Sequence, residues 1–160
     1  MRIKIIAVGQ HIAEWARIAT QDYLGRFPRD FSVELKEVRT EHRSGLPPAK
    51  LMQAEAERIL AHIEPGEYVI ALDEHGRTLT TMEFAQALSR WRNEAFDLVF
   101  IIGGPDGLAP SVKEVANESL RLSSMTLPHI ARRTTLSCVV DFGQTSLPSK
   151  LTPCPLIVFC

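Results

Sequence analysis

The 160-residue chain has few cysteines, no long hydrophobic run and almost no net charge. Its three cysteines, Cys138, Cys154 and Cys160, all lie beyond residue 137. An odd number confined to one end does not form a disulfide framework, and the spacing matches no zinc signature. No apolar stretch approaches the roughly 20 residues that a helix needs to cross a bilayer. These absences predict a protein with no metal centre and no membrane partner.

The charge balance gives no global basic field that would attract nucleic acid. The formal net charge is −1 at pH 7, although residues 121–160 hold four cations against one acid, Asp141. A weakly basic end can contact phosphate, but so few cations over that length are a weak signal. Composition therefore neither requires nor excludes an RNA partner.

The remaining composition is that of an ordinary globular protein. Hydrophobic residues make up 45% and charged residues 23%, which fits a single domain over residues 1–160. The N-terminus MRIKIIAVG has a basic start and a short apolar run, but the small-residue cleavage site of a signal peptide is lacking. We expect a first strand there and a cytoplasmic location.

Strand-like and helix-like patterns alternate along the chain. Short apolar or alternating runs predict strands over residues 2–9, 32–38, 68–72, 98–102 and 120–122. Apolar residues at helical spacing predict helices over residues 11–26, 48–63 and 110–118, and a further helix capped by Thr80 or Thr81. Residues 73–76 are expected to form a polar turn. The alternation predicts an α/β fold with a mostly parallel sheet of five to six strands and helices on both faces.

The stretch DLVFIIGGPDGL, Asp97 to Leu108, contains the most unusual local pattern. Its buried-type strand ends abruptly in a glycine cluster, and ligands of open α/β sheets bind outside the carboxyl ends of the strands. An ordinary strand-to-helix turn would explain the same glycines equally well. The cluster lacks the G-x-G-x-x-G spacing of a dinucleotide fingerprint and the Gly-Lys-Ser/Thr of a phosphate-binding loop.

Three predicted strand ends collect unusual residues, at 72–73, 103–105 and 122–127. A crevice lined by glycine, leucine and backbone amides suits a flat aromatic ring. Asp73 could bind a ribose, although an acid at a strand end is more often a solvated turn residue or a cap. His129 is either a catalytic or RNA-contacting group or, more commonly, a loop histidine with one structural hydrogen bond.

Two further groups of side chains carry weaker signals. His42, His62 and His75 have no metal-ligand spacing. The basic and aromatic cluster at residues 26–29 could meet RNA by phosphate contact and stacking, but arginines are also common at helix ends because they interact with the helix dipole.

Five of these segments together resemble one known family, the ribosomal large-subunit methyltransferase H family of small SPOUT-class enzymes. The segments are MRIKIIAVG at residues 1–9, YLGRFPRD at 23–30, ALDEHGR at 71–77, FIIGGPDGL at 100–108 and LSSMTLPH at 122–129. They occur in order and nearly without gaps through His129. IGGPDGL and LSxMTLPH are specific as a pair.

The resemblance implies a SPOUT-type fold with a C-terminal trefoil knot, a homodimer, and S-adenosyl-L-methionine as cofactor. It implies methylation of N3 of a pseudouridine in the helix 69 loop of 23S rRNA, within the assembled 70S ribosome. The cofactor-binding positions that carry over are Leu72, Gly103, Leu122, Ser123, Ser124, Met125, Thr126 and Leu127. No catalytic residue carries over, and the group that handles the N3 proton is unknown.

After His129 the chain departs from the family pattern. The family continues as an amphipathic helix and ends in Tyr-His-Arg, whereas residues 130–160 show no helical period and include three prolines and all three cysteines. Our hypothesis for this loss is a reading-frame change near codon 130, which sequencing of the locus would test.

A catalytically inactive homologue that binds only the cofactor or the ribosome is the alternative function. A Rossmann-type nucleotide enzyme is disfavoured because its fingerprint is lacking.

Overall fold

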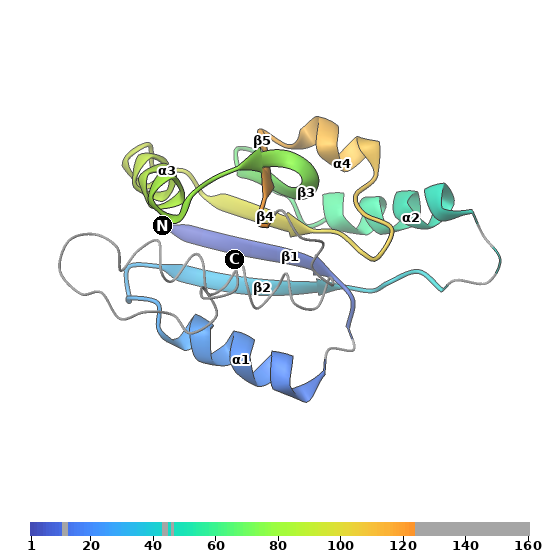
Figure 1. Ribbon diagram of the computed structural model, residues 1–160, viewed down its shortest axis with the longest axis horizontal. Coiled ribbons are helices and arrows are strands. Elements are labelled where there is room, and N and C mark those ends of the chain that lie inside the picture. Colours follow the sequence, from blue (N-terminus) through green and yellow to red (C-terminus); the bar gives the residue numbers. More distant parts are fainter. Residues whose placement is uncertain (11–12, 43–44, 46, 124–160) are drawn as a thin grey trace.

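The computed structural model describes residues 1–10, 13–42, 45 and 47–123. Along them run β1 (Arg2–Val8), α1 (Glu14–Gly25), β2 (Ser32–Val38), α2 (Pro48–Leu60), β3 (Tyr68–Thr78), α3 (Thr81–Asn93), β4 (Leu98–Ile102), α4 (Pro110–Val115) and β5 (Glu118–Arg121). The strands form one parallel sheet in the order β2-β1-β4-β3-β5 (Figure 1). The predicted α/β fold is therefore confirmed, while the segment expected to form the trefoil knot lies outside the described residues.

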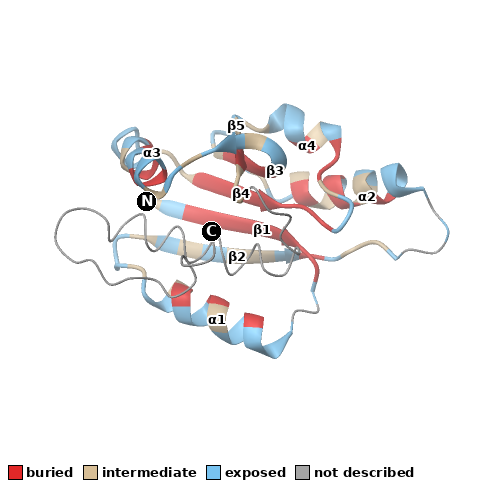
Figure 2. Cartoon of the chain, viewed as in Figure 1, coloured by how far each residue is buried: buried red, intermediate tan, exposed pale blue. Residues whose placement is uncertain are grey.

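Strand β4 lies at the centre of the sheet and is buried along its whole length (Figure 2). It pairs in parallel with β1 on one side and β3 on the other. Its side chains alternate between two hydrophobic clusters: Leu98, Phe100 and Ile102 join one, and Val99 and Ile101 join the other. A strand buried on both faces has no polar side, which explains its continuous apolar sequence.

Helices cover both faces of the sheet, as the sequence predicts. Ala56 and Ile59 of α2 and Val112 of α4 pack in one cluster. Phe84 and Trp91 of α3 pack in the other, where their rings meet edge to face. The layers of the fold are therefore α2 and α4, the sheet, and α3 together with α1, whose Leu24 packs against the same cluster as α3.

The local signals at helix starts are confirmed. Thr80 caps α3: its side chain accepts a hydrogen bond from the backbone N–H of Glu83 at 3.3 Å, and Glu83 accepts one from the Thr80 N–H at 2.7 Å. This reciprocal capping box satisfies two N–H groups that a helix leaves unpaired. Pro48 and Pro110 occupy the first turns of α2 and α4, where the missing N–H costs nothing.

The polar turn expected at residues 73–76 is wrong, because β3 continues through these residues to Thr78. Leu72 and Arg77 both pair with Leu120 of β5, so the four residues between them form a bulge. A Cβ on Gly76 would lie 2.6 Å from the Leu120 carbonyl carbon. Only glycine lets the bulge approach β5 this closely.

The other element boundaries shift by a few residues. Helix α4 ends at Val115 rather than at Glu118, and β5 begins earlier than the expected Leu120. Asn117 explains both shifts: its backbone N–H donates to the Val69 carbonyl at 2.8 Å, and its side-chain oxygen accepts from the Val69 N–H at 2.8 Å. This pairing with β3 draws the chain out of the helix.

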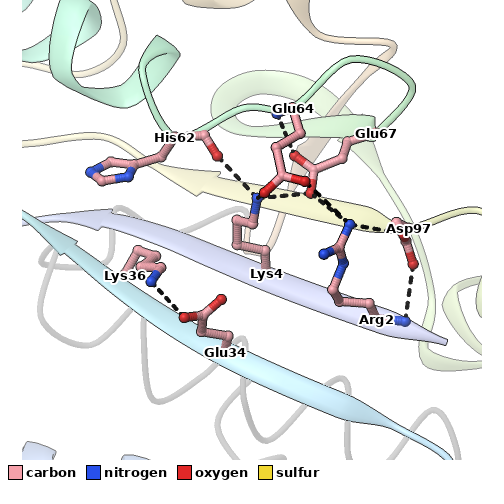
Figure 3. A network of polar contacts seen from close by, with 8 residues as sticks. All are labelled: Arg2, Lys4, Glu34, Lys36, His62, Glu64, Glu67 and Asp97. Carbon is pink, nitrogen blue, oxygen red and sulfur yellow. Dashed lines mark hydrogen bonds and ion pairs between the residues drawn. The ribbon is translucent and has the colours of Figure 1, made fainter.

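A charged network joins the amino ends of β1 and β4 to the loop that precedes β3 (Figure 3). The Lys4 side chain is 5% exposed and its Nζ lies 2.8 Å from the Glu67 carboxylate, which is 3% exposed. Lys4 also donates to the His62 carbonyl at 3.0 Å and contacts Glu64 at 3.3 Å. Burial lowers the pKa of Lys4, but its hydrogen bonds to the Glu67 and Glu64 carboxylates and their negative charges outweigh this effect, so the net shift of its pKa is upward.

Removing one partner of this buried pair should cost far more stability than removing a surface charge. We expect Glu67→Gln to lower the free energy of unfolding by about 3 kcal/mol, the lower end of the usual range because Glu64 still contacts Lys4. Glu34→Gln is the control: Glu34 pairs with Lys36 at the exposed surface of β2, and its loss should cost less than about 1 kcal/mol. Urea denaturation measures both. Equal costs would contradict the structural role of Lys4.

Candidate functional site

The carboxyl ends of β1 and β4 meet at one edge of the sheet, level with Leu72 in the middle of β3. Ile102, the last residue of β4, pairs with Ala7 of β1 and with Leu72 of β3. Gly103 therefore leaves the sheet beside Leu72. Leu122, which follows β5, packs against the same hydrophobic cluster that contains Leu72. The structure thus brings Leu72 and Gly103 together at this edge, and it brings Leu122 to the cluster under it.

The remaining predicted cofactor residues are only partly described. Ser123 lies just after β5, and its carbonyl accepts a hydrogen bond at 2.9 Å from Nε of Arg121, the last residue of β5. This bond fixes the direction in which the chain leaves the sheet. Ser124, Met125, Thr126 and Leu127 lie outside the described residues, as do His129 and the tail that follows it.

The glycine loop, residues 103–107, folds as a tight turn after β4. The Gly107 N–H donates to the Gly104 carbonyl at 3.1 Å, and Gly107 has a φ of 96°, which favours glycine. A Cβ on Gly103 would lie 2.7 Å from the Gly107 carbonyl oxygen. A Cβ on Gly104 would lie 2.7 Å from Oε2 of Glu55. The backbone contact therefore requires glycine at position 103, whether or not a ligand approaches it, whereas at position 104 the contact is with the end of the Glu55 side chain.

The residues after the glycine loop anchor it in the core. Leu108 is 6% exposed and Ala109 is 2% exposed, and both pack with Val112 of α4 against the sheet. The loop is therefore held between a buried strand on one side and a buried helix start on the other. A backbone fixed in this way can present its polar groups to a ligand without further ordering.

Asp73 has a structural role at the same edge. Its side chain is 8% exposed, forms an ion pair with Lys113 of α4, and accepts a hydrogen bond at 2.9 Å from the His75 N–H. Burial raises the pKa of Asp73, but the bonds from Lys113 and from the His75 backbone outweigh this effect and leave the pKa lowered. Asp73 thus ties the bulge of β3 to α4, as a local cap would. A contact with a ribose stays a prediction.

Two charged residues near this edge escaped the sequence-based prediction. Lys113 carries no local signal, because its partner is 40 residues away in the chain. Glu55 does carry one: it lies four residues after Leu51 and four before Ile59, within the apolar stripe of α2, and it is 7% exposed. A charged residue at a core position of an amphipathic helix is a departure that requires an explanation.

The basic cluster at residues 26–29 is partly engaged within the protein. The Arg26 guanidinium pairs with Asp22 and lies 4.9 Å from the centre of the Tyr23 ring.

Among the described residues no group of three or more His, Cys, Asp or Glu side chains could hold a metal ion. No helix in the described part of the chain is long and apolar enough to span a membrane.

Comparison with known proteins places this fold in a family. The family described as "Predicted SPOUT methyltransferase" matches residues 1–137. Since the match covers most of the chain, the protein belongs to the SPOUT methyltransferases and is a methyltransferase enzyme. The family resemblance predicted from the sequence motifs is confirmed.

Individual relatives narrow the family further. The chain is similar to proteins named ribosomal RNA large subunit methyltransferase H. The protein of Delftia acidovorans is 47% identical over 136 residues, which is 85% of this chain and 88% of the relative. The protein of Albidiferax ferrireducens is 46% identical over the same shares, and that of Bordetella petrii is 46% identical over 138 residues, 86% of this chain and 88% of the relative.

The packing of Gly103 leads to a direct test. Gly103→Ala should lower the free energy of unfolding by about 2 kcal/mol, because the new methyl group meets the backbone of Gly107 and cannot be relieved by a side-chain rotation. Gly25→Ala in α1 is the matched control, because no atom lies within 4 Å of its Cβ position. Alanine in a helix should raise the free energy of unfolding, by at most about 1 kcal/mol. Thermal unfolding measures both. A harmless Gly103→Ala would contradict this loop geometry.

The Asp73–Lys113 pair should contribute stability that depends on pH. Because the pKa of Asp73 is lowered in the folded state, this stability is present at neutral pH and is lost as the pH falls through the folded pKa. We expect Lys113→Met to cost about 1 kcal/mol at pH 7, a small value because Lys113 is 40% exposed. The cost should decrease as the pH falls, because protonation of Asp73 removes its charge. Urea titrations at pH 7 and pH 3 measure it, and a cost that does not change with pH would count against the pair.

Proposed function

We propose that this protein transfers a methyl group from S-adenosyl-L-methionine to the RNA of the large ribosomal subunit. The observation that carries the proposal is the identity of 46 to 47% to methyltransferases of that name over 85% of the chain. The convergence of Leu72 and Gly103 at one sheet edge supports it. The family resemblance supplies the finer parts of the proposal. The methylated atom is N3 of a pseudouridine in helix 69 of 23S rRNA, and the substrate is the assembled 70S ribosome. The enzyme acts as a homodimer in the cytoplasm.

The described residues suit a donor bound through backbone groups. The Leu72 side chain is apolar, Gly103 presents a backbone without a side chain, and the Ser123 carbonyl is held by Arg121. Such a set can hold an adenine ring by apolar contact and by hydrogen bonds to peptide groups. The further positions, Ser124 to Leu127, complete the proposed site.

The chemistry requires positioning more than acid–base catalysis. When bound, S-adenosyl-L-methionine supplies an electrophilic methyl group on a sulfonium: the nitrogen–carbon bond forms as the sulfur–carbon bond breaks. The substrate nitrogen must lose its proton to a base or to solvent. The chain's contribution is to hold the two reactants in line, which is worth several kcal/mol of the barrier. A rigid loop wedged between β4 and α4 is suited to that task.

Binding and transfer measured side by side test this function. We expect calorimetry to show that the purified chain binds S-adenosyl-L-methionine, and we expect labelled methyl groups to appear in 23S rRNA when 70S ribosomes are added. NAD serves as the negative control. Mapping the modified nucleotide then tests the pseudouridine. Failure to bind S-adenosyl-L-methionine would overturn the proposal.

The inactive homologue remains the second candidate because the family match ends at residue 137. Residues 138–160 therefore lie outside the family match, and the Tyr-His-Arg ending expected from the family resemblance is not in this sequence. Cofactor binding without methyl transfer to 70S ribosomes would favour this second function. A chain carrying the Tyr-His-Arg ending of the family would be the control for the transfer assay.

A further inference from the structure

Glu55 lies beneath the glycine loop, where an acid has a high energetic cost. It belongs to α2, is 7% exposed, and its Oε2 fills the space that a side chain on Gly104 would need. Its Oε1 accepts a hydrogen bond at 3.1 Å from the backbone N–H of Glu41, in the segment that follows β2. One carboxyl group thus contacts two segments that lie far apart in the sequence.

The segment that follows β2, residues 39–42, is held to α2 by a second residue as well. Arg58, one turn after Glu55, donates to the Arg39 carbonyl at 2.9 Å and forms an ion pair with Glu41. At the start of the segment, the Gly9 N–H donates to the Val38 carbonyl at 2.7 Å. The backbone of the segment is therefore fixed at the carboxyl end of the sheet, close to the glycine loop.

The side chains of this segment point to a role toward substrate. Arg39 and His42 are exposed, and Arg39 forms no ion pair within the described part of the chain. An exposed arginine is a usual partner of RNA phosphates. The segment thus places an exposed arginine at the edge of the sheet from which the glycine loop emerges.

We propose that Glu55 is a positioning residue for methyl transfer, which holds the segment 39–42 and the glycine loop in a fixed relation to each other. This inference rests on the proposed function, because it takes the glycine loop as a wall of the donor site. Glu55 touches no reacting atom in this account. It acts through the Glu41 N–H on one side and through the backbone of Gly104 on the other.

Burial and the neighbouring charges determine how costly the ionised form of Glu55 is. Burial is the largest influence and raises the pKa of Glu55, while the hydrogen bond from Glu41 lowers it. Asp106 in the glycine loop and the Glu41 carboxylate raise the pKa further, and Arg58 lowers it. On the α4 side the cation Lys113 is engaged by Asp73. The net pKa of Glu55 is raised.

Because the pKa of Glu55 is raised, its contribution to folding stability and its contribution to donor affinity should change in opposite directions with pH. Folding is favoured by the protonated form, so stability from this group is present in acid and is lost as the pH rises through the folded pKa. Positioning is favoured by the ionised form, because a carboxylate accepts a stronger hydrogen bond from Glu41 than a protonated acid does. Affinity for the donor should therefore fall as the pH drops through the same value.

The experiment compares Glu55→Gln with Glu57→Gln in the full-length chain. Glu57 is an exposed carboxylate on the same helix, so its substitution is the matched control. We expect Glu55→Gln to melt at or above the wild-type temperature at pH 8, yet to bind S-adenosyl-L-methionine about tenfold more weakly, which is the loss of about 1.4 kcal/mol. The pH dependence of binding should be flatter than in the wild type. Glu57→Gln should change neither quantity.

Two outcomes would overturn the role of Glu55. One is unchanged affinity with an unchanged pH profile in Glu55→Gln, and the other is a loss of affinity that accompanies an equal loss of stability. Amide hydrogen exchange separates this inference from the proposed function. Protection of the Glu41 and Gly107 N–H groups should fall in Glu55→Gln even without cofactor. If the wild type binds no S-adenosyl-L-methionine, the proposed function fails, and unchanged exchange would then overturn the positioning role independently.

Discussion

The pairing of β4 between β1 and β3 is the constraint on which the rest of the structure depends. Its five residues are buried on both faces, and its last residue is opposite Ala7 and Leu72 at the same level of the sheet. Because Ile102 is the last residue of β4, this register determines where the glycine loop emerges. A slip of one residue would turn every side chain of β4 to the other face and move Gly103 away from Leu72.

Charged side chains fix the loops at both ends of this sheet. At the amino end Lys4 and Glu67 form a buried pair that holds the loop before β3. At the carboxyl end Asp73 joins β3 to α4, and Glu55 joins α2 to the segment after β2. Apolar packing supplies most of the stability of such a fold but has little directional character. The charged pairs and hydrogen bonds therefore specify which loop conformations the packed layers present.

Much of the fold was predictable because its signals are local. The buried pattern of β4, the cap at Thr80 and the prolines at residues 48 and 110 each act within one turn or one strand. The bulge of β3 was not predictable, since it exists only because Leu72 and Arg77 share one partner on β5. Leu72 and Gly103 were predicted to lie at neighbouring strand ends. Leu72 does pair with Ile102, the residue before Gly103, but β3 continues past Leu72 to Thr78. Their contact with a cofactor stays a prediction.

Gly104 and Glu55 show why the site could be predicted only in part. The glycine is conspicuous in the sequence, whereas the carboxyl group that occupies the space beside it lies 49 residues earlier, on another element. Neither residue alone predicts this contact. A glycine after a strand suits many turns, and an acid in an apolar stripe of a helix has no evident partner in the sequence. Together they form one arrangement, in which the Glu55 carboxyl group occupies the space that a Cβ on Gly104 would need. A pattern along the chain reveals the first half of such a pair, and only the packing of α2 against the glycine loop reveals the second.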